Sequence, residues 1–347
     1  MARINIKQWP VPIEAGRLRI LEAALDAGVP YPHGCGSGEC GSCKSVLLSG
    51  NVTMDPYSRD ALSDAEREKG LILACRARLV SDVSVRWLSA HKPLPMLKVN
   101  TQVAEVRHLA HDVVALTLGL PAGTGFDFRP GQYAKLRTGK LPARSYSMAN
   151  QPGQGVLEFH IRVLPDGVLS EFIATELKAG DSVEVRGPFG DAHWDEQLAR
   201  ADEPLLLLAG GTGLAPIVSV LDAALRHGVP GRRIHLYHGV RAERDLYAGA
   251  QLAARARAEG FRFVPVYSET AAAAGRKGML HLAVAEDFSN LAEACIHVAG
   301  PPPMVNAVTA LALARGAGAS SIRADAFHPA EPQKKSLWER VTAWGDL

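Results

Sequence analysis

Gly34-Cys35-Gly36-Ser37-Gly38-Glu39-Cys40-Gly41-Ser42-Cys43 is the stretch that decides the fold of the first part of this 347-residue chain. A fourth cysteine, Cys75, follows after 31 intervening residues. The glycines let the backbone turn tightly, so that backbone amides can face the sulfurs of converging thiolates. Residues 1–6 do not form a charged leader followed by an apolar segment, so we expect metal ligation and not disulfides.

The spacing of the cysteines indicates the kind of metal centre. Cys35-x4-Cys40-x2-Cys43 with a distant Cys75 is the ligand spacing of plant-type 2Fe-2S clusters. A structural zinc site is the alternative, but zinc favours paired Cys-x2-Cys knuckles, and only Cys40 and Cys43 form one. Visible absorption distinguishes the two. Cys295 stands alone on a predicted buried strand, where we expect a plain core residue.

The surroundings of this loop resemble the plant-type 2Fe-2S ferredoxin module, from about Ile4 to Leu88. Alternation at residues 4–6 predicts a strand, and the pattern from Leu21 to Ala27 predicts a helix. The resemblance implies a β-grasp-like α+β domain over residues 1–91. Two nearby prolines make residues 91–96 a predicted linker.

Residues 98–196 have a different pattern. Apolar residues alternate with a period of two over 99–106, 113–120 and 156–163, which predicts a small antiparallel β-barrel. Within it, Arg144-Ser145-Tyr146-Ser147 offers a cation for a diphosphate, an aromatic wall for a flavin ring and a donor for its reactive nitrogen, in that order. Arg-x-Tyr-Ser is short, and an ordinary strand is the alternative interpretation.

The context of this motif favours a flavin site. In order, the segments 128–133, 144–150, 160–163, 167–170 and 187–190 resemble the FAD domain of the ferredoxin-NADP reductase superfamily. The start of a predicted helix at 167–170 can receive phosphate. His160 and Arg162 have solvent-facing strand residues as their alternative interpretation. The resemblance implies that FAD is bound by Arg144, Ser145, Tyr146, Ser147, His160, Ile161, Arg162, Gly167, Val168, Leu169 and Ser170.

Over residues 203–330 strands alternate with helices, which predicts a Rossmann-like parallel sheet and an α/β domain. The buried strand 205–209 leads into the glycine turn 210–213, where small residues let the backbone approach a diphosphate. With the segments 237–241, 275–278 and 299–304, it resembles the nucleotide domain of the same superfamily. The nicotinamide nucleotide is then expected at Gly211, Thr212, Gly213, Arg241, Gly300 and Pro301.

The end of this domain carries one departure from the superfamily. Ala299 stands where relatives usually have a cysteine beside the nicotinamide, which is expected to slow or retune hydride transfer. Ser147 and Phe327 are the predicted catalytic residues. Phe327 is expected to cover the flavin ring, and a core phenylalanine is the alternative interpretation. Glu269 predicts NADH over NADPH, because a carboxylate repels a 2'-phosphate. Asp245, near Arg241 and Arg244, points the same way, and a solvated helix face is the alternative interpretation. Residues 331–347 form a polar tail.

As a whole, the chain resembles the reductase components of bacterial ring-hydroxylating dioxygenases and multicomponent monooxygenases. The resemblance implies electron flow from NADH to FAD, then to the 2Fe-2S cluster, then to an oxygenase component or an intermediate ferredoxin, in aromatic or hydrocarbon oxidation. A flavin is needed because a nicotinamide gives two electrons together and iron centres accept one. The alternatives are a reductase for a deoxysugar-type radical dehydrase, and a redox-sensing interaction protein that does not turn over.

Composition excludes several other classes of function. The formal net charge is +2, from 38 basic and 36 acidic residues, so no nucleic-acid partner is expected. The most apolar segment, residues 204–225, is interrupted by glycines and Pro216, so we expect no membrane span. We expect a cytoplasmic protein.

Overall fold

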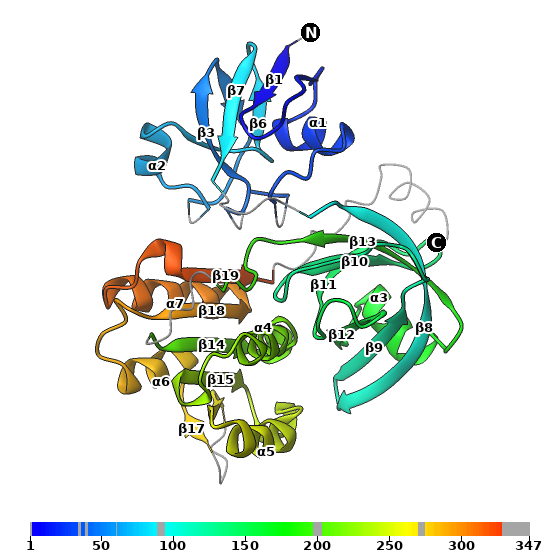
Figure 1. Ribbon diagram of the computed structural model, residues 1–347, viewed down its shortest axis with the longest axis vertical. Coiled ribbons are helices and arrows are strands. Elements are labelled where there is room, and N and C mark those ends of the chain that lie inside the picture. The colour runs from blue at the N-terminus through cyan, green and yellow to red at the C-terminus, as the bar shows by residue number, and fades with distance from the viewer. Residues whose placement is uncertain are drawn as a thin grey trace, which may run out of the picture.

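The structure is a computed structural model that describes residues 2–33, 36–38, 41–59, 61–88, 94–196, 203–269 and 275–327. Within these residues the strands form three large sheets and a two-stranded ribbon. In Figure 1 the N-terminal sheet lies at the top, the antiparallel sheet at the lower right and the parallel sheet at the lower left. The expected fold class, a β-grasp-like domain, an antiparallel barrel and a Rossmann-like sheet, is confirmed.

The N-terminal sheet has the strand order β2-β1-β7-β3-β5. Its first and last strands in sequence, β1 and β7, pair in parallel, with Ile4 opposite Val83. Helix α1 (Ile20–Asp26) places Ile20 and Leu21 in the core of this domain because its apolar residues share one face. The remaining elements are β1 (Arg3–Ile6), β2 (Ile13–Glu14), β3 (Lys44–Ser49), β5 (Leu71–Leu73), β7 (Val83–Trp87), the ribbon β4 (Val52–Met54) and β6 (Ala77–Leu79), and α2 (Asp64–Glu68).

The second sheet is antiparallel throughout, with the order β11-β10-β13-β8-β9-β12. Its two edge strands meet at a bridge between Met148 and Phe159, and the Ala149 amide donates to the Glu158 carbonyl at 2.7 Å. The sheet therefore closes on itself as a barrel, with both bridge residues fully buried. Its elements are β8 (Leu97–Ala110), β9 (Val113–Gly119), β10 (Tyr133–Arg137), β11 (Arg144–Ser147), β12 (Val156–Arg162), β13 (Ser182–Phe189) and α3 (Val168–Thr175).

The third sheet is parallel, with the order β17-β16-β15-β14-β18-β19. All six residues of its strand β14 (Leu205–Gly210) are buried because helices cover both faces. Helices α4 (Leu214–Arg226) and α5 (Gly249–Glu259) cover one face, and α6 (Leu280–Asp287) and α7 (Pro302–Ala314) cover the other. The other strands are β15 (Ile234–Val240), β16 (Arg262–Tyr267), β17 (Arg276–Lys277), β18 (Cys295–Gly300) and β19 (Ile322–Ala326).

Helix α4 also attaches the parallel sheet to the barrel. The Gln151 side chain of the barrel donates to the Ser219 carbonyl at 2.6 Å, and the Ser219 hydroxyl donates to the Asn150 carbonyl at 2.7 Å. Both bonds are buried, and α4 lies between the two sheets in Figure 1. Among the helices of the described residues, none is both long and apolar enough to span a bilayer. The predicted tail, residues 331–347, lies outside the described residues.

Candidate functional site

Two of the four predicted metal ligands sit at the ends of neighbouring strands. Cys43 directly precedes β3, and Cys75 comes two residues after β5, its antiparallel partner. Each is only 3% exposed, and neither is in a disulfide. Cys35 and Cys40 lie outside the described residues, so their expected convergence with Cys43 and Cys75 stays a prediction.

Glycines shape the loop that carries these cysteines. Gly36, Gly38 and Gly41 have φ angles of +73°, +84° and +74°, which side-chain-bearing residues rarely adopt. A Cβ at Gly41 would also lie 3.0 Å from the Ala61 carbonyl oxygen. Buried thiols beside a loop of left-handed glycines fit an iron–sulfur cluster, whose sulfurs receive hydrogen bonds from such turns.

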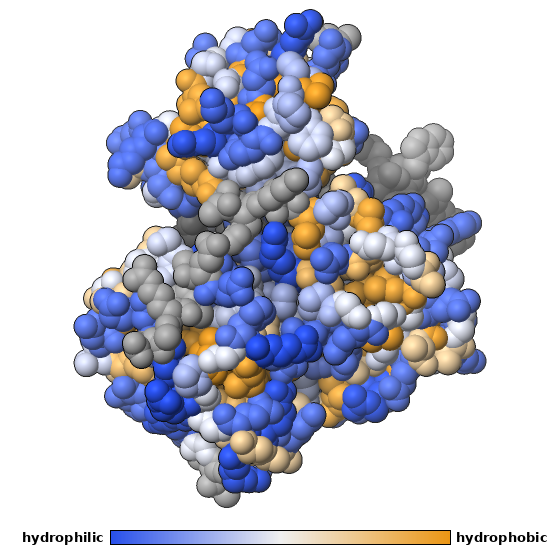
Figure 2. Space-filling model, viewed as in Figure 1, coloured by the Kyte–Doolittle hydropathy of each residue, from blue (hydrophilic) through white to orange (hydrophobic). Residues whose placement is uncertain are grey.

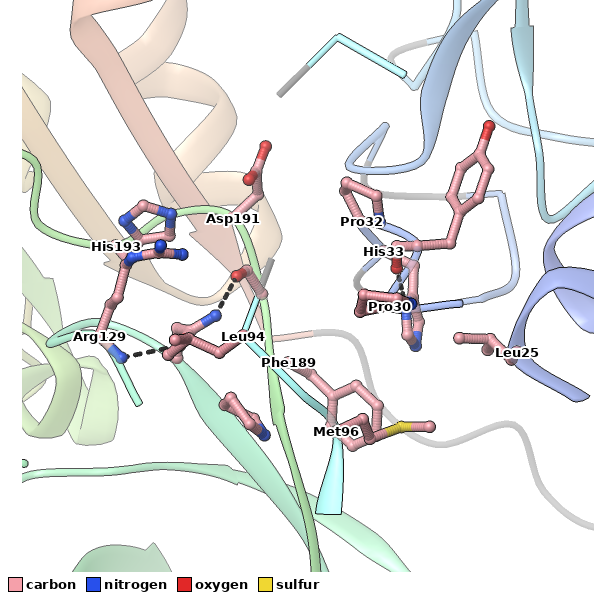
Figure 3. A pocket seen from close by; sticks show the side chains of 14 residues that line it. Leu25, Pro30, Pro32, His33, Leu94, Met96, Arg129, Phe189, Asp191 and His193 are labelled. Atoms are coloured by element: carbon pink, nitrogen blue, oxygen red, sulfur yellow. Dashed lines mark hydrogen bonds between the residues drawn. The ribbon is translucent and has the colours of Figure 1, made fainter. Parts of the chain in front are cut away.

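The segment just before the cysteine loop packs against the barrel. The ring of His33 meets the ring of Phe189 edge-on, with centroids 5.0 Å apart. Phe189 in turn lies 5.5 Å from the ring of Tyr133, and Tyr133 pairs with Ser147 in the register of β10 and β11. Figure 3 shows Pro30, Pro32 and His33 on one side of a small cavity and residues of the barrel on the other.

The predicted flavin residues of β11 differ in how far their side chains are exposed. Arg144 is half-buried, and its guanidinium donates to the neighbouring Ala143 carbonyl at 3.0 Å. It forms no ion pair with a carboxylate of the described residues. Ser145 is exposed, whereas Tyr146 is half-buried and desolvation raises its pKa to about 12, against the opposing effect of Arg144. An arginine without a carboxylate partner beside an aromatic ring fits the diphosphate and ring of FAD.

Ser147 faces an acidic residue of the parallel sheet. Its hydroxyl lies 3.5 Å from Asp325 Oδ2, across 178 positions of sequence. Desolvation raises the pKa of Asp325 to about 7, and the contact with Ser147 acts in the opposite direction. Asp325 belongs to β19, and Phe327 follows it with its amide bonded to the Gly300 carbonyl at 2.9 Å. Phe327 is half-buried and packs against the core between the barrel and the sheet.

The side chains of the predicted FAD residues in β12 and α3 do not all point to the same side. Ile161 is fully buried in the barrel core. His160 contacts Tyr247, and Arg162 forms an ion pair with Asp112, whose Oδ2 lies 2.9 Å from Nε and 2.7 Å from Nη2 of the guanidinium. Neither is therefore a plain solvent-facing strand residue. At the start of α3, Val168 is exposed, Gly167 is half-buried, Leu169 is buried, and the buried Ser170 hydroxyl donates to the Gly167 carbonyl at 2.9 Å.

The glycine turn lies at the carboxyl end of β14, as expected for a nucleotide site. Gly211, Thr212 and Gly213 form a 3-10 turn, and the first two are half-buried while Gly213 is buried. A Cβ at Gly213 would lie 2.1 Å from the Ala299 carbonyl oxygen, so only glycine fits there. Gly300 is buried with φ of +146°, and Pro301 is exposed directly before α7. A half-exposed turn of small residues before a helix fits a dinucleotide phosphate.

Arg162 lies beside this turn, because its Nη1 comes within 3.7 Å of the Cβ position of Gly211. Ala299, which replaces the usual cysteine, is buried and pairs with Ala209 and Asp325. The structure thus brings the flavin-predicted strands β11 and β12 against the turn and against β19.

Arg241 is exposed, and its Nε lies 3.7 Å from Asp245 Oδ2. The interpretation of Asp245 as part of a solvated helix face is wrong, since it is 8% exposed and accepts from the Ala242 amide at 3.0 Å. Its η3 turn (Glu243–Asp245) lies against His111 of the barrel, with His111 Nε2 3.6 Å from Asp245 Oδ1. Glu269 is exposed, and its amide bonds to the Arg241 carbonyl at 3.0 Å.

Sequence reasoning missed Asp112 and Tyr247 as residues of this region, and it gave His238 no role of its own within the segment 237–241. Each contacts a residue of the predicted site across a long stretch of sequence, and neither Asp112 nor Tyr247 belongs to a short motif with a recognised chemical role. The face of the molecule in Figure 2 is predominantly hydrophilic, with apolar areas that include parts of the N-terminal domain and of the barrel.

Three family models match the chain in succession. They are a 2Fe-2S iron-sulfur cluster binding domain over residues 3–80, an oxidoreductase FAD-binding domain over 100–194 and an oxidoreductase NAD-binding domain over 207–310. Their order is the one expected from the sequence.

Similar proteins match over nearly the full length. The reductase subunit of an aromatic O-demethylase from Amycolatopsis sp. is 39% identical over 318 residues, which are 90% of this chain and 94% of that protein. The electron transfer component of toluate 1,2-dioxygenase from Pseudomonas putida is 35% identical over 86% of this chain and 88% of that protein. Among solved structures, a cytochrome P450 reductase from Amycolatopsis superposes with a TM-score of 0.79 at 36% identity, over 95% of this chain and 99% of that one.

Proposed function

Because this chain belongs to the family of reductase components of bacterial dioxygenase and monooxygenase systems, we propose that it carries single electrons from NADH to an oxygenase component. The partner receives them directly or through a separate ferredoxin, in aromatic or hydrocarbon oxidation. When bound, FAD would accept the two electrons of one hydride, and the 2Fe-2S cluster would pass electrons on one at a time. We assign residues 1–91 to the cluster, 98–196 to FAD, 203–330 to the nucleotide and 331–347 to a tail.

The contact of His33 with Phe189 is the observation that carries this proposal. His33 stands two positions before Cys35, the first proposed cluster ligand, and it is only 8% exposed. Phe189 leads through Tyr133 to Ser147, the residue proposed to face the reactive edge of the flavin. Two successive ring contacts, His33 with Phe189 and Phe189 with Tyr133, thus lie between the two proposed redox sites, which supports electron transfer within the chain.

The proposed roles follow from the chemistry of each side chain. Arg144 binds the flavin diphosphate, Tyr146 covers the ring and Ser147 donates to the reactive nitrogen. His160, Ile161, Arg162 and the start of α3 belong to the same FAD proposal, and Ile161 would contribute through its backbone because its side chain is buried in the barrel core. Phe327 covers the flavin until the nicotinamide displaces it. The cluster ligands are Cys35, Cys40, Cys43 and Cys75. The nucleotide lies along Gly211, Thr212, Gly213, Arg241, Gly300 and Pro301.

Several finer features belong to the same proposal. NADH is the preferred donor, because Glu269 stands exposed beside the backbone of Arg241 and repels an added phosphate. The small net charge of +2 argues against nucleic acid as a partner. We place the protein in the cytoplasm, where the proposed ligand cysteines stay reduced.

The test separates the two halves of the electron path. Cys40→Ser should abolish cluster-dependent reduction of cytochrome c by NADH and leave reduction of ferricyanide by the flavin intact. Cys295→Ala is the matched control, since Cys295 is buried in β18 and burial raises its pKa to about 11. Full cytochrome c activity in Cys40→Ser would contradict the proposed order of electron flow. Oxygen uptake that depends on a copurified partner and its substrate then identifies the oxygenase.

A further inference from the structure

A row of half-buried and buried side chains joins the barrel to the glycine turn of the parallel sheet. His160 of β12 has its Nε2 3.3 Å from Glu158 Oε1 and its Nδ1 3.3 Å from the Tyr247 hydroxyl. The Tyr247 ring meets the imidazoles of His160 and His238 edge-on, with centroids 5.4 and 5.6 Å apart. The row ends at the Gly211 carbonyl, 3.0 Å from His238 Nε2. It therefore connects a barrel strand to the turn proposed for the nucleotide.

The donor of each hydrogen bond in this row can be assigned from the partner atoms that can only accept a hydrogen. A carboxylate and a carbonyl have no hydrogen to give, so His160 Nε2 and His238 Nε2 carry the hydrogens. His160 Nδ1 then accepts from the Tyr247 hydroxyl while the ring is neutral. Complete burial lowers the pKa of His238 to about 4, so its imidazole stays neutral and donates through Nε2 alone.

The bond from His238 fixes one peptide of the turn. Gly211 has a φ of +54°, and its carbonyl also accepts from the Leu214 amide. Both lone pairs of this oxygen are thus used, and the carbonyl is held toward His238. In a planar trans peptide the following N–H points the opposite way. The amide of Thr212 is therefore directed away from this row.

We propose that His238 is a positioning residue for the nicotinamide nucleotide. It holds the Gly211 carbonyl so that the Thr212 amide faces the diphosphate, and Tyr247 and His160 brace it from the barrel. Outward amides at the start of a helix bind phosphates, and α4 begins directly after this turn. The inference rests on the proposed use of the glycine turn. It also gives the His160 imidazole a role at the contact between domains, in addition to the place proposed for His160 in the FAD site.

The experiment compares two substitutions of His238 in the FAD-loaded protein. His238→Gln keeps an N–H donor near the position of Nε2, and His238→Leu removes it. Stopped-flow reduction of the flavin by NADH gives the dissociation constant of the nucleotide and the limiting rate separately. We expect His238→Leu to raise the dissociation constant about tenfold, as for one lost hydrogen bond, and His238→Gln to stay within about twofold of wild type. The limiting rate should change far less than the dissociation constant.

Two further variants separate positioning from packing. His235→Leu makes the same change on the same strand, but on the opposite face, where His235 meets Phe288, and it should leave nucleotide binding unchanged. Tyr247→Phe keeps the ring and removes the hydroxyl that contacts His160. Because Tyr247 is proposed to act on the turn only by bracing His238, the effect of this change on nucleotide binding should not add to that of His238→Leu.

Three results would overturn the inference: a folded His238→Leu variant that binds NADH like wild type, equal weakening in His238→Gln, or strictly additive effects with Tyr247→Phe. A wild-type flavin that neither NADH nor NADPH reduces would instead overturn the proposed function.

Discussion

The imidazole of His33 meets the ring of Phe189 edge-on, with centroids 5.0 Å apart, and the two residues belong to different domains. His33 is held in place by its Nδ1, which donates to the Tyr31 carbonyl at 2.8 Å. On the barrel side, Lys135 lies over the Phe189 ring at 5.3 Å. Each ring is thus fixed by its own domain, so the contact sets how the cysteine loop sits on the barrel.

Replacing Phe189 should slow electron transfer into the cluster. Phe189→Leu removes the edge contact with His33 and loosens the seating of the cysteine loop, whereas the flavin-predicted strand β11 keeps its pairing with β10. An edge-to-face aromatic pair contributes about 0.5 to 1.5 kcal/mol. Rapid-mixing spectroscopy follows flavin reduction and cluster reduction separately, and only the second should slow. Phe288→Leu is the matched control, because Phe288 meets His235 at the same 5.0 Å within the nucleotide domain. Equal slowing in both variants would contradict the role given to Phe189.

Asp325 should make the stability of the flavin-free protein depend on pH. Desolvation raises its pKa from 3.8 to about 7, so the folded state holds a proton that the unfolded chain has already lost. Between about pH 4 and 7 the folded state therefore binds more protons, and the free energy of unfolding falls as pH rises. Asp325→Asn removes this contribution. Urea unfolding at several pH values should show a steeper decline for wild type than for the variant across that interval, and parallel curves would show that Asp325 ionises normally.

Arg144→Ala should release FAD. The Arg144 guanidinium is half-buried and donates a hydrogen bond to the adjacent Ala143 carbonyl, so its charge remains available to a diphosphate. A hydrogen bond to a charged group contributes about 1.5 to 3 kcal/mol, which corresponds to roughly tenfold to hundredfold weaker binding. Flavin fluorescence after gel filtration measures the loss. Arg137→Ala is the control, because Arg137 lies on the neighbouring strand and is paired with Glu184 at 3.0 Å. If the Arg144→Ala variant retained FAD, Arg144 would not be part of the flavin site.

Much of the fold could be predicted because local patterns specify it. The period-two runs of residues 99–106 and 156–163 correspond to β8 and β12, and the apolar run before the glycine turn is β14. The closure of the barrel at Met148 and Phe159 could not be predicted, because a bridge between edge strands leaves no mark on either strand alone. Asp245 was misread for a similar reason, since the barrel that buries it is distant in sequence.

The residues of the candidate site likewise divide into those that the sequence could predict and those that it could not. Motif residues such as Arg144 and Gly213 are recognisable because their chemistry or size is required at one position. Tyr247 is not, because its contact with His160 spans 87 positions and joins two domains. A tyrosine in the turn between η3 and α5 gives no signal of such a contact until the fold is known.

Glu269 should determine the choice of nicotinamide nucleotide. Glu269 is exposed two residues after the end of β16, and its backbone is bonded to that of Arg241, so its charge lies where we place the adenosine ribose. Wild type should therefore favour NADH. Glu269→Arg replaces a carboxylate that repels the 2'-phosphate with a guanidinium that can bind it. The kcat/KM for NADPH should therefore rise about tenfold, as for one gained charge-assisted contact. Glu105→Arg makes the same change of charge on the exposed face of the barrel and should leave the preference unchanged. If wild type uses NADPH better, or if both variants shift the preference alike, the charge of Glu269 does not set the selectivity.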